Sequence, residues 1–235
     1  MTLQPDELRA VALSAQVAAV ATLASAAPGV ALGWILSRWR FRGRMLVETV
    51  IMLPLVLPPV VVGYGLLVLL GRRGPIGRVL EDWLGAQIAF TWWGAAIAAG
   101  VVGFPLLVRS CRLGFDAVDP RLEGMARTLG AGRVRTWLRV TLPLAWPALV
   151  AGLTLAFARA WGEFGATIMI AGNIEGRTRT VPLAIYSAMQ TPGQMAQVWR
   201  LAALSVIVAL AAMLLSEWLA RRAGRTGASQ ERPLP

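Results

Sequence analysis

Two charged side chains, Arg159 and Glu163, lie four residues apart inside the long apolar segment 144–171. Residues at this spacing share one face of a helix. A charge at the middle of a bilayer costs about 2.5–3.5 kcal/mol on insertion scales, so we expect this face to be buried in protein or wet rather than exposed to lipid. Two interpretations stay open: an ion pair that locks the helix into its bundle, or part of a gate on the path of a solute.

Other chemically reactive residue types are scarce. The chain of 235 residues has no His and a single Cys, Cys111, and all 23 of its basic side chains are Arg. It therefore lacks the residues for an ordinary zinc site, a Ser-His triad or a disulfide. Without Lys it has no phosphate-binding loop of the Gly-x-x-x-x-Gly-Lys-Ser/Thr form. We expect no catalytic residue, no metal site and no cofactor bound by this chain, so that any ATP chemistry belongs to a partner.

The composition is typical of a membrane protein. Hydrophobic residues make up 57% of the chain and charged residues 15%, whereas soluble domains have about 45–50% and about 25%. About 20 apolar residues in a helix cross the hydrocarbon layer. We predict an all-α integral membrane protein with one transmembrane domain, residues 11–219, and five membrane-spanning helices at about 11–36, 45–70, 88–108, 144–171 and 201–219.

The distribution of Arg predicts the orientation, because cytoplasmic loops carry an excess of basic residues. Fifteen Arg fall on the side that holds the loop after the first segment, the loop 109–143 and the tail 220–235, and six fall on the other side. Residues 1–10 are therefore expected outside, and the tail, which we expect to be disordered, in the cytoplasm. The net charge of +11 would also suit a nucleic-acid-binding protein, but five apolar segments leave no room for a soluble core.

Helix-breaking residues interrupt the second segment. Pro54, Pro58 and Pro59 each remove a backbone hydrogen bond. In lipid this is tolerated only where neighbouring helices or a water-lined cavity satisfy the freed carbonyls. The segment is therefore either a bent helix that lines a pathway or a kinked packing helix. Candidate residues of a path or gate, here and in the fourth segment, are Pro58, Pro59, Tyr64, Arg159, Gly162, Glu163, Phe164 and Gly165.

The long loop 109–143 contains a predicted short helix. Asp119 and Pro120 are typical of a helix start, with Asp as the cap and Pro in the first turn. Gly130 is expected to end the helix. Such a helix suits docking into a groove of a soluble partner, although it could instead lie flat on the bilayer surface. Its apolar positions are Leu122, Met125, Ala126 and Leu129, and its polar face holds Arg121, Glu123 and Arg127.

The same loop resembles the cytoplasmic loop of permeases of binding-protein-dependent ABC importers. Their motif is Glu-Ala-Ala, three residues, Gly, nine residues, Ile, one residue and Leu-Pro. Aligned on Gly130, the sequence matches at Ala126, Gly130, Leu142 and Pro143, is conservative at Val140, departs at Gly124 and Met125, and places Glu123 one position early. The resemblance implies that the ATPase-coupling residues are Leu122, Glu123, Gly124, Met125, Ala126, Arg127, Thr128, Leu129 and Gly130.

Longer stretches are similar to the molybdate permeases of bacteria, with sulfate and tungstate permeases as close relatives. They are residues 53–64, 71–74, 126–132, 157–167, 173–182 and 190–193. The resemblance implies a type I ABC importer permease fold and molybdate import through the inner membrane. It also implies a homodimer of permeases, two ATPase subunits that use ATP and Mg²⁺, and an extracytoplasmic oxyanion-binding protein. Sulfate or tungstate import is the alternative.

Segments 71–87 and 172–198 would then face the binding protein. Docking candidates are Arg72, Arg73, Arg177 and Arg179, because guanidinium groups suit acidic surfaces and oxyanions. The alternative is that these are solvated loop charges. Two other functional classes stay open: a secondary transporter or channel that works without an ATPase, and a membrane scaffold with no solute flux.

Overall fold

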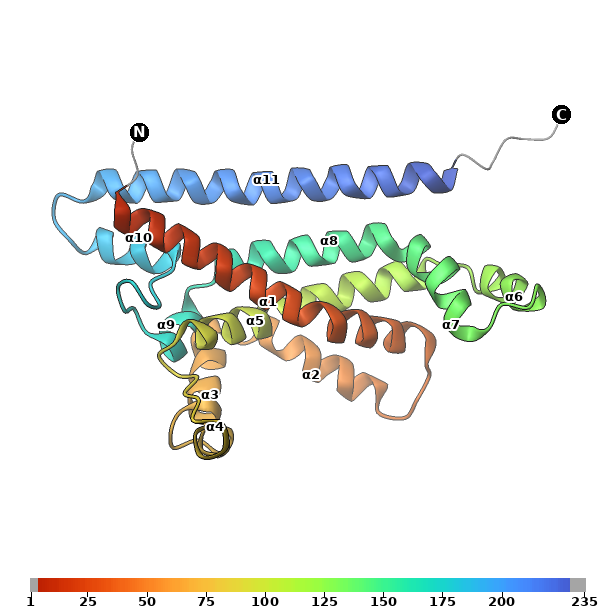
Figure 1. The fold of residues 1–235 in the computed structure, drawn as a ribbon, viewed down its shortest axis with the longest axis horizontal. Coiled ribbons are helices and arrows are strands. Elements are labelled where there is room, and N and C mark those ends of the chain that lie inside the picture. Colours follow the sequence, from red (N-terminus) through yellow and green to blue (C-terminus); the bar gives the residue numbers. More distant parts are fainter. Residues whose placement is uncertain (1–3, 229–235) are drawn as a thin grey trace.

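The computed structural model describes residues 4–228, without the side chains of residue 84 and of residues 220–228. All regular elements in this part of the chain are helices. Four long helices run along the long axis of the molecule: α1 (Pro5–Arg38), α5 (Trp92–Asp116), α8 (Leu142–Trp161) and α11 (Met195–Ala228) (Figure 1). The shorter ones are α2 (Arg44–Val56), α3 (Pro59–Leu70), α4 (Pro75–Leu84), α6 (Pro120–Thr128), α7 (Arg133–Thr136), the π-helix η1 (Trp137–Thr141), α9 (Gly165–Ala171) and α10 (Val181–Met189).

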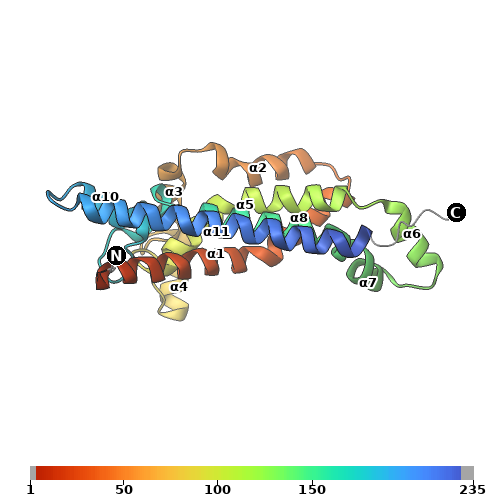
Figure 2. The ribbon, with the colours of Figure 1, turned by 90° about the horizontal axis from the view of Figure 1, so that it is seen from above.

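Apart from α2, which packs alongside α5, the short helices gather toward the two ends of the long ones (Figure 1). Helices α6 and α7 lie at one end, whereas α3, α4, α9 and α10 lie toward the other (Figure 1). Helix α11 runs along α8, as the views from the side and from above both show (Figure 2). The loop 109–143 was expected to contact a soluble partner, and the segments 71–87 and 172–198 were expected on the opposite side. The structure places the first toward one end of the bundle and the other two toward the other end (Figure 1).

Local sequence explains where the long helices begin. Pro5 is the first residue of α1, and the Glu7 carboxylate accepts a hydrogen bond from the Gln4 backbone N–H at 2.8 Å. At the start of α5, the Thr91 hydroxyl accepts from the Gly94 N–H at 3.4 Å. These side chains satisfy backbone groups that a helix terminus leaves unpaired.

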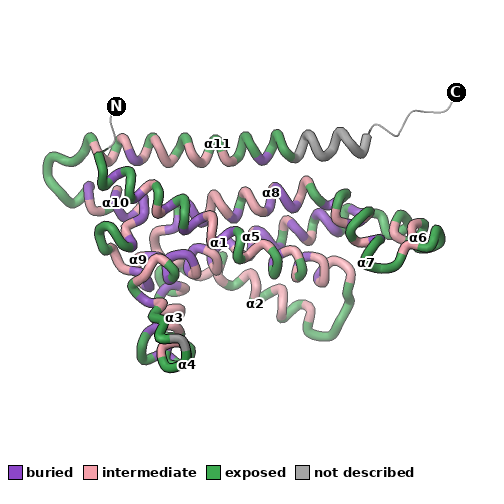
Figure 3. The backbone as a smooth tube through the Cα atoms, viewed as in Figure 1, coloured by how far each residue is buried: buried purple, intermediate pink, exposed green. Residues whose placement is uncertain are grey.

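Small side chains fill the contacts between the long helices. Ala95, Ala98 and Ala99 of α5 are completely buried. Side chains of this size let helix backbones approach closely, which favours association of helices in a membrane. Figure 3 shows the buried residues concentrated where α1, α5, α8 and α9 meet, while α6 and much of α11 are exposed.

The prediction of an all-helical membrane protein is confirmed. Four helical stretches are long and apolar enough to cross a membrane: Pro5–Arg38, Trp92–Asp116, Arg133–Trp161 and Met195–Leu219. The pair formed by α2 and α3, which is bent by 111°, makes a fifth if it is counted as one span.

Several boundaries differ from the sequence prediction. The segment 45–70 forms two helices that are separated at Leu57 and Pro58. A residue before proline is disfavoured in the helical conformation, and Leu57 is accordingly extended (φ −68°, ψ 145°). The segment 144–171 is interrupted between α8 and α9, at residues 162–164. The tail expected to be disordered from residue 220 instead continues α11 to Ala228, since Ala and Arg favour helix. Helices α4 and α10, in segments expected to be loops, were not predicted; residues 1–3 and 229–235 lie outside the described residues.

Candidate functional site

Helix α6 forms as the sequence predicted. The Asp119 carboxylate caps it by accepting a hydrogen bond from the Arg121 N–H at 2.8 Å. Gly130 follows the helix in the left-handed conformation (φ +86°), and the Ala131 N–H donates to the Ala126 carbonyl at 3.0 Å. Gly adopts this conformation without the steric cost that a Cβ atom brings, so Gly130 is suited to ending the helix here.

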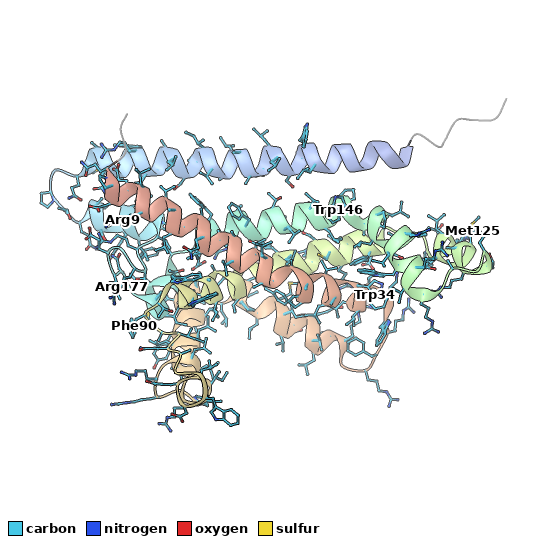
Figure 4. The ribbon with its side chains drawn as sticks, in the orientation of Figure 1. Arg9, Trp34, Phe90, Met125, Trp146 and Arg177 are labelled. Atoms are coloured by element: carbon cyan, nitrogen blue, oxygen red, sulfur yellow. The ribbon has the colours of Figure 1, made fainter. Side chains whose placement is uncertain are left out.

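The apolar side chains of α6 and of Leu129 just after it point away from the bundle. Leu122 is 43% exposed, Met125 62% and Leu129 87%. Figure 4 shows Met125 at the far end of the molecule. Of residues 121–130, all but Glu123 and Ala126 are exposed, so Gly124, Arg127, Thr128 and Gly130 also lie on this surface. Exposed apolar side chains on a short helix are typical of a surface that another protein covers.

Glu123 faces inward, not toward solvent on a polar face as the sequence analysis expected. Its side chain is only 14% exposed and forms an ion pair with Arg38 at 2.9 Å. The Thr141 hydroxyl donates to the same carboxylate oxygen at 2.8 Å, and the Arg127 guanidinium lies 3.9 Å from the other. Arg38 also donates to the Val118 carbonyl at 3.0 Å. This carboxylate therefore connects α6 to the end of α1 and to η1, which leads into α8.

A second group of predicted residues meets where two broken helices cross. Helix α3 packs on α9 so closely that a Cβ atom on Gly63 would lie 2.5 Å from the Ala166 carbonyl oxygen. A Cβ atom on Gly165 would lie 2.9 Å from the Cβ of Pro59. The breaks at Pro58 and at residues 162–164 are thus neighbours in space, although a hundred residues separate them in the sequence.

Arg159 and Glu163 form an ion pair at the end of α8, with Nη1 and Oε2 separated by 2.6 Å. The other Glu163 oxygen accepts a hydrogen bond from the Ala166 N–H at 2.8 Å, in the first turn of α9. The Glu163 side chain is 2% exposed and that of Arg159 30%. A buried carboxylate needs such partners, because an unpaired charge away from water is costly. The ion pair, one of the two interpretations of this spacing, is thus formed, while a part in gating stays a prediction.

The aromatic candidates of this region lie in different surroundings. The Phe164 ring packs against the Tyr186 ring of α10, with centroids 5.2 Å apart. Tyr64 of α3 is instead 57% exposed, and Gly162 is exposed as well. The cluster around the breaks therefore contains Pro59, Gly165 and the charged pair, whereas Tyr64 faces outward.

The four arginines expected to face a binding protein divide into two kinds. Arg72 pairs with Glu81 at 2.7 Å, and its hydrogen bonds hold the pKa of Glu81 below the usual value. Arg179 pairs with Glu175 at 3.1 Å. Arg73 and Arg177 are exposed, and their guanidinium groups have no ionic or hydrogen-bonding partner among the described residues. Arg177 lies at the end of the molecule opposite Met125 (Figure 4).

Several structurally prominent residues were missed by the sequence analysis. Glu7, with 1% of its surface exposed, pairs with Arg200 at 2.7 Å and connects the start of α1 to α11. Phe90 has a left-handed backbone (φ 60°), and its N–H donates to the Ile170 carbonyl at 2.8 Å. Sequence spacing carries no signal for these contacts, since Glu7 and Arg200 are 193 residues apart.

Comparison with known proteins identifies relatives along almost the whole chain. Residues 29–225 match the family described as binding-protein-dependent transport system inner membrane component. The chain is 52% identical over 229 residues to the molybdenum transport system permease protein ModB of Escherichia coli (strain K12), covering 96% of this chain and 100% of the relative. It is 49% identical over 216 residues to ModB of Haemophilus influenzae, covering 92% and 94%.

A more distant relative and a solved transporter structure also match this chain. The sulfate transport system permease protein CysT of Salmonella typhimurium is 37% identical over 186 residues, covering 79% of this chain and 67% of the relative. Among solved structures, the inward-facing MetNI methionine ABC transporter superposes with a TM-score of 0.72 over 92% of this chain and 95% of that chain. Its sequence identity is 16%, so this likeness concerns the fold alone.

Proposed function

This chain belongs to the inner membrane components of binding-protein-dependent transport systems, and on that basis we propose that it is the permease subunit of an ATP-driven molybdate importer. The observation that carries the proposal is the 52% identity to ModB of Escherichia coli along the full length of that relative. The sulfate permease CysT is less similar, at 37%, which favours molybdate over sulfate. As a multi-pass inner-membrane permease, the chain has no catalytic site and binds no cofactor; a partner subunit hydrolyses ATP.

The proposed orientation places the N-terminus outside and the loop 109–143 in the cytoplasm. Helices α6 and α7 and the last turns of α11 gather at one end of the molecule (Figure 1). Fifteen of the 23 Arg belong to the segments that the orientation places in the cytoplasm, as the excess of basic residues in cytoplasmic loops predicts. The complete importer would contain two copies of this chain, two ATPase subunits and an extracytoplasmic binding protein.

Helix α6 would be the contact with the ATPase. Its exposed apolar side chains, Leu122 and Met125, and the neighbouring Leu129 suit insertion into a groove of a soluble protein. When the ATPase subunits close, displacement of α6 would pull on Glu123. The ion pair with Arg38 and the hydrogen bond from Thr141 would then carry the movement into α1 and η1.

The contact between α3 and α9 would form part of the translocation path. Both helices follow breaks, at Leu57 and Pro58 and at residues 162–164, where the chain can change direction without disrupting a continuous helix. An anion that passes here would be repelled by a free carboxylate. Glu163 does not present one, because Arg159 and the first turn of α9 neutralise it.

The binding protein would dock at the opposite end, with Arg73 and Arg177 as contacts for its acidic side chains. These two guanidinium groups are exposed and unpaired within the described part of the chain. Arg72 and Arg179 would instead shape their own loops, since each is paired with a glutamate close by in the sequence.

Reconstitution tests this function. The permease, its ATPase and the binding protein are placed in proteoliposomes, and uptake of labelled molybdate is measured with and without ATP, with tungstate and sulfate as competitors. We expect uptake that requires ATP and that excess sulfate does not inhibit. Uptake that prefers sulfate would overturn the substrate assignment. ATP-independent uptake would indicate a secondary transporter or channel, and no flux of any of these anions would indicate a scaffold.

A further inference from the structure

An open apolar groove lies between the second half of α1 and the first half of α8. Its volume is about 980 Å³, and small or apolar side chains line it from Ala26 to Trp34 on one wall and from Leu142 to Leu153 on the other. Figure 4 shows Trp34 and Trp146 on this half of the molecule. The groove is at the upper end of the size range of small-molecule sites, about 300–1,000 Å³.

The length of the groove matches one leaflet of a bilayer. From residue 26 to residue 38 of α1, the wall rises about 18 Å at 1.5 Å per residue. Half of a hydrocarbon core of about 30 Å is about 15 Å. A molecule that filled the groove along α1 would therefore extend from near the middle of the membrane to its surface.

One end of the groove is strongly basic. Arg38, Arg127 and Arg133 line it together with a single acidic residue, Glu123. Arg38 is paired with Glu123, but Arg127 approaches that carboxylate only to 3.9 Å. Arg133 is exposed and has no ionic partner in the described part of the chain. Tryptophans, which favour the level of the lipid headgroups, line the groove here as well: Trp34, Trp39 and Trp137.

We propose that this groove binds an anionic phospholipid, with its acyl chains between α1 and α8 and its phosphate between Arg127 and Arg133. The apolar length fits a lipid tail, and the excess of positive charge at one end fits an anionic headgroup. The lipid would belong to the cytoplasmic leaflet. This choice of leaflet rests on the proposed orientation of the chain, whereas the binding of the lipid in the groove does not.

Native mass spectrometry tests the proposal on the purified complex of permease and ATPase, exposed to equal amounts of phosphatidylglycerol and phosphatidylcholine. We expect selective retention of phosphatidylglycerol. Each Arg near an anionic headgroup contributes about 1 kcal/mol, so the double variant Arg127→Gln/Arg133→Gln should retain it about 30-fold less strongly. The matched control is Arg135→Gln/Arg139→Gln, which removes two exposed charges from the neighbouring segment outside the groove.

A second pair of variants tests the apolar end. Ala27→Trp places a large side chain in the groove, far from the arginines, and should abolish retention. Ala15→Trp, at an exposed position of the same helix outside the groove, should preserve it.

Three results would overturn the proposal: equal retention of both lipids, equal loss in the two double Arg variants, or retention that survives Ala27→Trp. Chemical cross-linking of the variant Ala31→Cys, in a Cys111→Ala background, checks other occupants of the groove. A cross-link from this groove position to a second permease copy or to the ATPase would also overturn it. None of these readouts measures transport, so failure of the importer assignment would be seen separately.

Discussion

Removing the Glu123 carboxylate should separate ATP hydrolysis from transport. In Glu123→Ala, α6 loses the ion pair with Arg38 at 2.9 Å and the hydrogen bond from Thr141 at 2.8 Å. A hydrogen bond to a charged group contributes about 1.5–3 kcal/mol. Breaking a fully buried ion pair costs about 3–5 kcal/mol. The side chains of Glu123 and Arg38 are still 14% and 17% exposed, so we expect a loss of about 2–3 kcal/mol in the attachment of α6.

A loss of this size raises the population of detached α6 roughly 30- to 150-fold, at 1.4 kcal/mol per factor of ten. The assay is the number of molybdate ions imported per ATP hydrolysed in proteoliposomes, together with hydrogen exchange of the α6 amides. We expect hydrolysis to continue, imported molybdate per ATP to fall and exchange to accelerate. Thr141→Val removes only the hydrogen bond to this carboxylate, worth about 1.5 kcal/mol at the lower end of the range for a charged acceptor, and should give an intermediate defect.

Asp116→Asn provides the control at the same end of the molecule. Asp116 is 42% exposed and pairs with Arg112 at 3.5 Å, and exposed pairs contribute about 0–1 kcal/mol. This variant should import as much molybdate per ATP as the unaltered chain. If Glu123→Ala also did so in an intact complex, the connection from α6 to α1 and η1 would have no part in coupling.

Three further changes have defined outcomes. Gly63→Leu should prevent the close contact of α3 with α9 and abolish uptake, because even a Cβ atom there would lie 2.5 Å from a backbone oxygen; folded protein is checked by size-exclusion chromatography. Gly130→Val should strain the end of α6 by about 1–2 kcal/mol, because the φ angle is +86°, and lower the uptake measured per ATP. Acidification should loosen the attachment of α4 to Arg72. Because Arg72 lowers the pKa of Glu81, their pairing is complete at neutral pH and is lost as the pH falls through that lowered pKa. Hydrogen-exchange protection of the α4 amides would detect the loss.

Each of these changes has a matched control. Gly65→Ala should be tolerated, since a Cβ atom at this position of α3 meets no atom within 4 Å. Gly132→Ala tests a glycine close to Gly130 that has an ordinary backbone (φ −64°). Arg72→Gln should remove the pH dependence of the protection factors in α4, which are exchange rates divided into the intrinsic rates at the same pH. Uptake by Gly63→Leu equal to that of the unaltered chain, or unchanged pH dependence of these protection factors in Arg72→Gln, would contradict the corresponding reasoning.

Much of the architecture followed from local sequence. Apolar runs located the membrane helices, and Asp119, Pro120 and Gly130 located α6 with its two ends. The spacing of Arg159 and Glu163 allowed the ion pair that they form. These features depend on backbone geometry, on helix periodicity and on the transfer of apolar side chains from water to lipid. All three are set by residues close together in the sequence.

The tertiary structure alone decided which distant residues meet. Glu123 was expected to face solvent, but its carboxylate turned inward because Arg38, 85 residues away, lies beside it once α1 packs against α5 and α8. In the same way, packing of α3 on α9 brought Pro59 next to Gly165, and α1 beside α8 created the groove that ends at Arg133. The sequence by itself determined the long helices and α6, the membrane character of the chain and the charge at one end of the bundle. Their mutual contacts arise from packing between segments far apart in the chain, for which spacing along the sequence carries no information.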